Sequence, residues 1–72
     1  MREVRFHREL YRGEHVDEAI KVYDRFARIE RAEEDAHWVV RLEGKSPERE
    51  RKIADELANY ALGLTIQQRG GI

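Results

Sequence analysis

The chain of 72 residues contains no cysteine, which excludes a disulfide framework, a thiolate nucleophile and every zinc or iron–sulfur site with cysteine ligands. It also lacks an excess of either charge, since 14 Lys and Arg face 15 Asp and Glu, whereas nucleic-acid binding usually needs a clear basic excess. No apolar run approaches the ~20 residues of a membrane span, and residues 1–5 lack the apolar stretch of a signal peptide. We therefore expect a cytoplasmic protein without a membrane segment.

The chain also lacks any Pro-, Gly- or Ser-rich linker and any repeat that would divide it. We expect a single domain over residues 1–69, followed by a flexible tail over 70–72. A domain of this size buries only about 60% of its unfolded surface, so its stability is expected to be marginal or shared with a partner.

Two periodicities define the first half of the chain. Val4 and Phe6 alternate with Arg5 and His7, which predicts a half-buried strand within residues 3–10. Apolar residues then recur at spacings of three and four, which predicts an amphipathic helix from about Glu14. That helical stripe comprises Val16, Ala19, Ile20, Tyr23, Phe26 and Ala27.

The second half predicts a hairpin and a helix. Residues 28–32 and 37–42 read as strands around a charged tip at 33–35, and the second strand places Trp38, Val40 and Leu42 on one face. Ser46-Pro47-Glu48 is typical of a helix start. The apolar stripe of this helix is Ile53, Leu57, Tyr60, Ala61 and Leu64.

Gly63 leaves two readings of the C-terminal segment open. It can end the second helix and release residues 64–68 as a fourth strand. Alternatively, the helix tolerates Gly63 at a cost of about 1 kcal/mol and continues to Arg69.

The order of these elements predicts an α+β fold, a two-layer sandwich with the order β-α-β-β-α. A right-handed crossover gives a three-stranded antiparallel sheet of order 1-3-2 with two helices on one face, a truncated ferredoxin-like architecture. Without a fourth strand, the first strand keeps an open edge that can accept a strand from a partner. The uncovered sheet face is expected to be polar and locally basic, with Arg5, His7, Arg28, Glu30, His37, Val39 and Arg41 on it.

Six runs of the chain carry a family resemblance. They are Val4-Arg5-Phe6 through Leu10-Tyr11, Glu18-Ala19-Ile20, Tyr23-Asp24-Arg25-Phe26, Trp38-Val39-Val40-Arg41-Leu42, Leu57-Ala58-Asn59-Tyr60-Ala61-Leu62 and Gln67-Gln68-Arg69. In these runs the chain resembles the HxsD-like proteins of the His-Xaa-Ser peptide-modification system. The chain departs from the family in the longer connection Gly13-Glu14-His15-Val16 and in its earlier end. The resemblance implies a small accessory protein that works beside a radical SAM enzyme, and it favours the continuing helix over a fourth strand.

Candidate chemistry is sparse, and we expect no catalytic residue, no cofactor and no metal. The histidines His7, His15 and His37 lack an obvious third ligand. Ser46, the only serine, is explained as a helix cap. Phe6 and Trp38 fall on the buried phase of their strands, so the aromatic platform of an RNA-binding sheet is missing from the uncovered face.

The sequence therefore predicts a non-catalytic accessory protein that binds a protein or peptide, and the resemblance implies that this partner is a radical SAM maturase or its substrate peptide. A small nucleic-acid-binding module and a self-associating structural domain, including a homodimer, are the alternatives. The second helix carries two apolar residues off its stripe, Leu62 and Ile66, which suit a partner. The candidate partner-binding residues are Arg5, His7, Arg28, His37, Arg41, Leu62 and Ile66.

Overall fold

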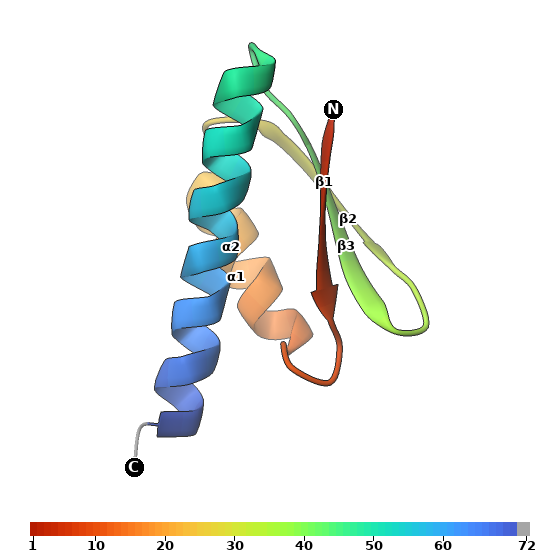
Figure 1. Cartoon of the computed structure of the whole chain (residues 1–72), viewed down its shortest axis with the longest axis vertical. Coiled ribbons are helices and arrows are strands. Elements are labelled where there is room, and N and C mark those ends of the chain that lie inside the picture. The colour runs from red at the N-terminus through yellow and green to blue at the C-terminus, as the bar shows by residue number, and fades with distance from the viewer. Residues whose placement is uncertain (71–72) are drawn as a thin grey trace.

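A computed structural model describes residues 1–70 of the chain, with side chains described as far as Gln67. The elements are β1 (Arg2–His7), α1 (Gly13–Tyr23), β2 (Arg28–Glu33), β3 (His37–Glu43) and α2 (Pro47–Gly70) (Figure 1). The strands form one sheet of order β1-β3-β2. The predicted α+β fold, its element order and its sheet order are confirmed.

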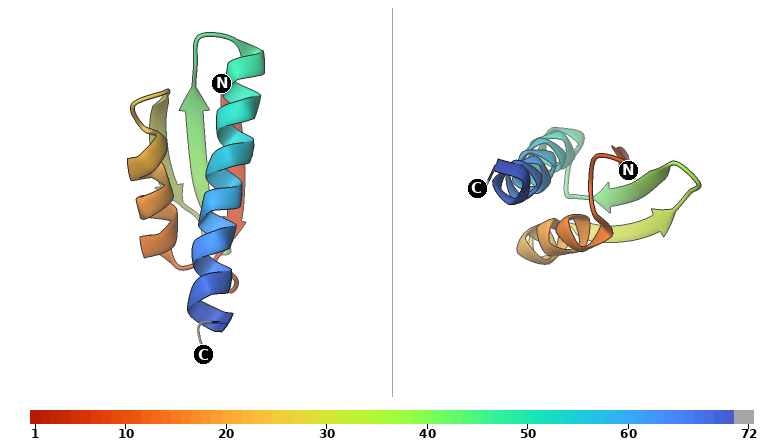
Figure 2. Two further views of the ribbon diagram at one scale, coloured as in Figure 1. Left: turned by 90° about the vertical axis from the view of Figure 1, so that its left-hand side faces the viewer. Right: turned by 90° about the horizontal axis from the view of Figure 1, so that it is seen from below.

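The central strand β3 pairs antiparallel with both of its neighbours. Val40 lies opposite Val4 and Arg31, and the next residue, Val39, lies opposite Arg5 and Ala32. Because side chains alternate along a strand, these two rows point to opposite faces of the sheet. Both helices cover the face that carries Val4 and Val40, with α1 on the β2 side and α2 on the β1 side (Figure 2). The opposite, uncovered face is called the open face below.

The core lies between the covered face and the two helices. Phe6 and Val40 from the sheet meet Val16 from α1 and Leu57 from α2 in one buried cluster. The Trp38 indole packs at its border, where its Nε1–H donates to the carbonyl of Tyr11 at 3.0 Å. Phe6 and Trp38 are therefore on the covered side, as their phase predicts.

Both elements of the first half end earlier than the sequence pattern predicts. β1 ends at His7 because the carbonyl of His7 accepts the N–H groups of Leu10 and Tyr11 in a turn. α1 ends at Tyr23, and Phe26 donates its N–H to the Tyr23 carbonyl in a further turn. The assignment of Phe26 to the buried helical stripe is wrong, since its side chain is 48% exposed. The chain needs residues 24–27 to reverse into β2.

The helix α2 continues through Gly63 to Gly70, so the continuing-helix reading is confirmed and residues 64–68 form no strand. Its start is as predicted, because Ser46 Oγ accepts the N–H of Arg49 at 3.2 Å. Gly70, the first residue of the predicted tail, is the last residue of α2. Residues 71–72 lie outside the described residues.

Glu50 is a buried carboxylate at the start of α2. Its Oε2 accepts the N–H of Gly44 at 3.0 Å, and its Oε1 lies 3.4 Å from the amino group of Met1. The Gly44 hydrogen bond, with the positive charges of Met1 and Arg2, lowers the pKa of Glu50 below its ordinary value of 4.5, although burial opposes the shift. Glu50 thereby links α2 to Gly44, directly after β3, and to Met1, directly before β1.

Glu50→Gln is expected to flatten the acid limb of the stability profile. A carboxylate whose pKa is lower in the folded state stabilises the fold above its unfolded pKa, near 4.5, and this stabilisation is lost as the pH falls through the folded pKa. Urea unfolding between about pH 2 and 7 measures this effect. The exposed Glu56→Gln is the control, and an equal slope for wild type and Glu50→Gln would contradict the role of Glu50.

Candidate functional site

The sheet residues predicted to bind a partner all lie on the open face. Arg5 and His7 come from β1, Arg28 comes from β2, and His37 and Arg41 come from β3. The register places His7 opposite His37, and their rings meet edge to face with centroids 5.2 Å apart. The structure thus brings together the two histidines that the strand phases predict.

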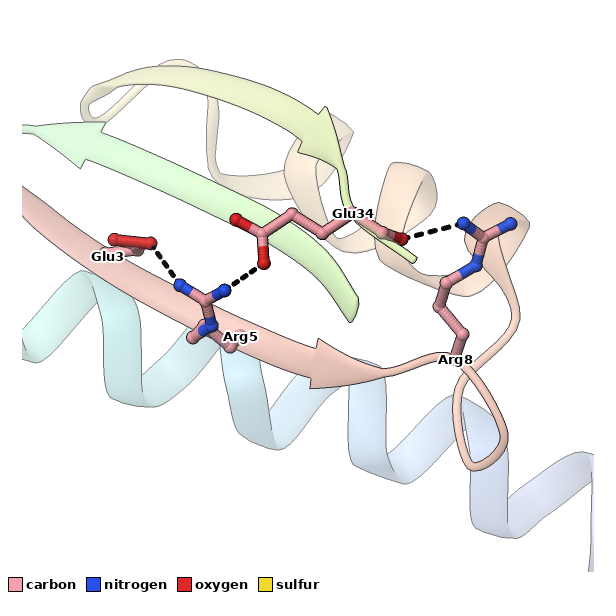
Figure 3. Close-up of polar contacts among 4 residues, drawn as sticks. All are labelled: Glu3, Arg5, Arg8 and Glu34. Atoms are coloured by element: carbon pink, nitrogen blue, oxygen red, sulfur yellow. Dashed lines mark hydrogen bonds and ion pairs between the residues drawn. The ribbon is translucent and has the colours of Figure 1, made fainter. Parts of the chain in front are cut away.

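The open face is not basic, contrary to the prediction. The same strand phases place Glu3, Glu30, Glu34 and Glu43 among its arginines. The Arg5 guanidinium illustrates the mixture, since it donates to Glu3 Oε1 at 2.9 Å and also to Glu34 (Figure 3). Because the glutamates outnumber the arginines, this face offers alternating charges and no positive surface for phosphates.

Val39 is buried on the open face, although it was predicted to be exposed there. Its side chain is 0% exposed. The reason is the ion pair between Arg5 on β1 and Glu34 beyond the end of β2, which passes over β3 (Figure 3). Arg8 fixes the same corner, since its Nη1 donates to the Glu34 carbonyl at 2.9 Å. This side of the sheet therefore has a small polar cover.

The histidines are held by different neighbours. His7 Nδ1 accepts the N–H of Glu9 at 3.2 Å. His15 is half-buried, a boundary position, in a pocket of about 300 Å³ with Tyr11, Arg12 and Thr65, and its Nδ1 has no hydrogen-bond partner. Among the side chains described, no three of His, Asp or Glu gather where they could hold a metal ion.

The outer edge of β1 carries free backbone groups. The N–H of Arg8 donates to the Ala36 carbonyl at 2.9 Å, which fixes the phase of the β1–β3 ladder. Since hydrogen-bonded pairs alternate in an antiparallel ladder, the even-numbered residues of β1 bond to β3 and the odd-numbered ones point outward. The N–H and C=O groups of Glu3 and Arg5 therefore form an unpaired edge, called the β1 edge below. No described segment pairs with it.

α2 carries a stripe of apolar side chains on the side away from α1. Ala58, Leu62 and Ile66 follow one another at intervals of four residues and so share one side of the helix. Tyr60, on the opposite side, contacts Tyr23 of α1 with ring centroids 6.1 Å apart. Since α1 lies on the β2 side of α2 (Figure 2), the stripe is on the side of α2 turned away from α1. We call these three residues the α2 flank; Leu62 is 41% and Ile66 is 58% exposed.

A second concave surface lies between the C-terminal end of α1 and the first turns of α2. The sequence analysis did not predict it. Tyr23, Phe26 and Ile53 line it with three charged side chains, and its volume is about 240 Å³. The residue that could have indicated this surface in the sequence is Phe26. The helical period placed Phe26 in the core, whereas the early end of α1 places it at this surface.

Comparison of the chain with protein-family models, curated proteins and solved structures finds no match. The resemblance to the HxsD-like proteins thus rests on the residues that carry it in the sequence. Over the described part of the chain, neither helix combines the length and hydropathy that a bilayer-spanning helix needs.

Proposed function

We propose that this chain is a non-catalytic accessory protein that binds a protein or peptide by pairing a strand of its partner with the β1 edge. The observation that carries the proposal is the unpaired edge of Glu3 and Arg5, on the side of the sheet that α2 covers. An added strand obtains affinity from backbone hydrogen bonds and specificity from side-chain neighbours on both faces. In this chain the added strand would have Glu3, Arg5 and His7 as neighbours on the open face and Leu62 of α2 on the covered face.

The resemblance to the HxsD-like proteins supports a particular setting for this binding. In that setting the partner is a cytoplasmic radical SAM maturase or its His-Xaa-Ser peptide, and the chain contributes no catalytic group. The mixed charge of the open face, with Arg5 engaged by Glu3 and Glu34, favours a protein partner over a nucleic acid. The buried position of Phe6 argues in the same direction.

Glu3→Pro is expected to weaken partner binding at least about tenfold, which corresponds to about 1.4 kcal/mol. Proline removes an outward N–H of the β1 edge and leaves the β3 ladder intact, because proline is tolerated on edge strands where the N–H faces solvent. Glu3→Gln is the matched control, since it removes the carboxylate charge and keeps the N–H. The measurement is calorimetric titration with the maturase and with its peptide.

Undiminished binding by Glu3→Pro would place the partner elsewhere on the chain, and binding to neither candidate would overturn the accessory role. A nucleic-acid role requires a salt-dependent shift of single-stranded RNA or DNA. Such a shift in this chain, persisting in Glu3→Pro, would favour that alternative.

A further inference from the structure

We propose that the occupant of the β1 edge in the isolated protein is a second copy of the same chain. The two β1 strands would pair antiparallel about a two-fold axis and join the two sheets into one. The inference rests on strand addition at the β1 edge, as the proposed function does. The inference goes further in two respects. It names as partner a second copy, which any solution of the protein contains, and it gives the register in which the two strands pair.

The phase of the backbone leaves only a few registers. Since the outward groups belong to odd-numbered residues, Glu3 and Arg5 must each face an odd-numbered residue of the second copy. One register places Glu3 opposite Arg5 of the second copy, and the two-fold axis repeats this contact. If one β1 strand slides by two residues along the other, Arg5 comes to lie opposite Arg5 of the second copy. A slide in the other direction places Glu3 opposite Glu3 of the second copy. Opposite charges stabilise a cross-strand pair and like charges destabilise it, so the β1 edge is self-complementary in the first register alone.

The same register continues the apolar layer on the covered side. The two-fold axis passes beside Val4, which then faces Val4 of the second copy at a non-hydrogen-bonded position, where side chains approach most closely. Val4 is half-buried and packs against both core clusters. Pairing would therefore extend an existing core and complete the burial of Val4.

The same arrangement sets the two α2 helices antiparallel. α2 runs alongside β1 in the same direction (Figure 1), and the two-fold axis reverses the direction of the second copy. Val4 packs in the cluster of Leu57 and in that of Ile53 and Ala54, so the axis lies level with this part of α2. The small side chain of Ala58, close to that level, permits close approach of the two helices.

The other edge of the sheet is less suited to this pairing. Arg31 of β2 forms an ion pair with Asp17 of α1, with 2.7 Å between Nε and Oδ1, and it also stacks over the Trp38 ring. Its charged side chain therefore borders the β2 edge, a common protection of sheet edges. Arg31 and Glu33, the outward residues of β2, also carry opposite charges, so the two edges differ in that Arg31 is held against α1 by Asp17.

Exchange of the charges tests both the dimer and its register. Sedimentation velocity of wild type over about 1–100 µM should show a dimer, as should the double variant Glu3→Arg/Arg5→Glu, in which the opposite charges have changed places. Glu3→Arg and Arg5→Glu, each alone, should dimerise at least about tenfold more weakly, about 1.4 kcal/mol. A mixture of these two single variants should form a heterodimer, because one copy then supplies both positive and the other both negative residues.

Glu30→Arg, on the open face but on β2, is the control and should leave the dimer unchanged. Circular dichroism confirms that each variant is folded, which matters for Arg5→Glu because Arg5 also holds Glu34. A folded, monomeric wild type at about 100 µM would overturn the dimer. A dimer that Glu30→Arg weakens as strongly as Glu3→Arg, or a double variant that is folded yet monomeric, would overturn this register.

The dimer and the proposed function can fail separately. A monomeric wild type whose maturase or peptide binding is lost in Glu3→Pro would overturn only the dimer. A dimer that responds to the charge exchange, in a chain that binds neither candidate, would overturn only the accessory role. Where both hold, a heterologous strand must displace the second copy, so its apparent affinity should fall as the concentration of the chain rises.

Discussion

Replacing Leu57 with alanine is expected to lower the free energy of unfolding by roughly 2–5 kcal/mol. Leu57 is 0% exposed and lies where α2 contacts Phe6, Val16 and Val40. The substitution removes transfer free energy and leaves a cavity among side chains from three elements, which cannot all move in to fill it. A domain of this length is stable by roughly 4–11 kcal/mol in total, so the loss is a large fraction of the whole.

The measurement is urea unfolding with comparison of midpoints at unchanged slope. Association would add stability that depends on concentration, so the comparison belongs in a Glu3→Pro background. Leu62→Ala is the matched control, because it removes the same atoms from an exposed position of the same helix and should change stability by less than about 0.5 kcal/mol. Equal losses for both leucines would contradict the assignment of the α2 flank as surface.

The sequence predicts much of this fold because its periods change where the elements change. Val4 and Phe6 fix the phase of β1 by simple alternation, and Ser46 with Pro47 marks the start of α2. The order of elements, with the handedness of the crossover, then leaves little choice of sheet order. These features depend on residues close together in the chain.

The features that the sequence did not predict depend on neighbours across the sheet. Alternation shows that Val39 points to the open face, but only the register and the fold of the hairpin tip bring Arg5 and Glu34 together above it. The charge of that face likewise depends on glutamates from all three strands and the tip. The spacing of Phe26 fits the helical period whether or not the helix extends that far. α1 ends at Tyr23 because the chain must turn into β2, and Phe26 therefore lies in the turn.

The β1 edge was predicted from the sequence, but its self-complementarity required the ladder phase. Strand alternation assigns side chains to faces and says nothing of which backbone groups point outward. The Arg8–Ala36 hydrogen bond supplies that information, and with it Glu3 and Arg5 become the outward pair. Both proposals therefore depend on one structural fact that a stability measurement can check.

Proline substitutions at consecutive residues of β1 should have opposite consequences. Val4 is even-numbered, so its N–H points to β3, and Val4→Pro would leave the carbonyl of Val40 unpaired as well as removing a packed side chain. We expect a loss of roughly 2–4 kcal/mol in the free energy of unfolding, measured by urea denaturation. Glu3→Pro removes only an outward N–H and should cost less than about 1 kcal/mol while it blocks strand addition. If Glu3→Pro were the more destabilising of the two, the odd-numbered residues of β1 would be the ones bonded to β3. That result would contradict the pairing of Glu3 with Arg5 of a second copy.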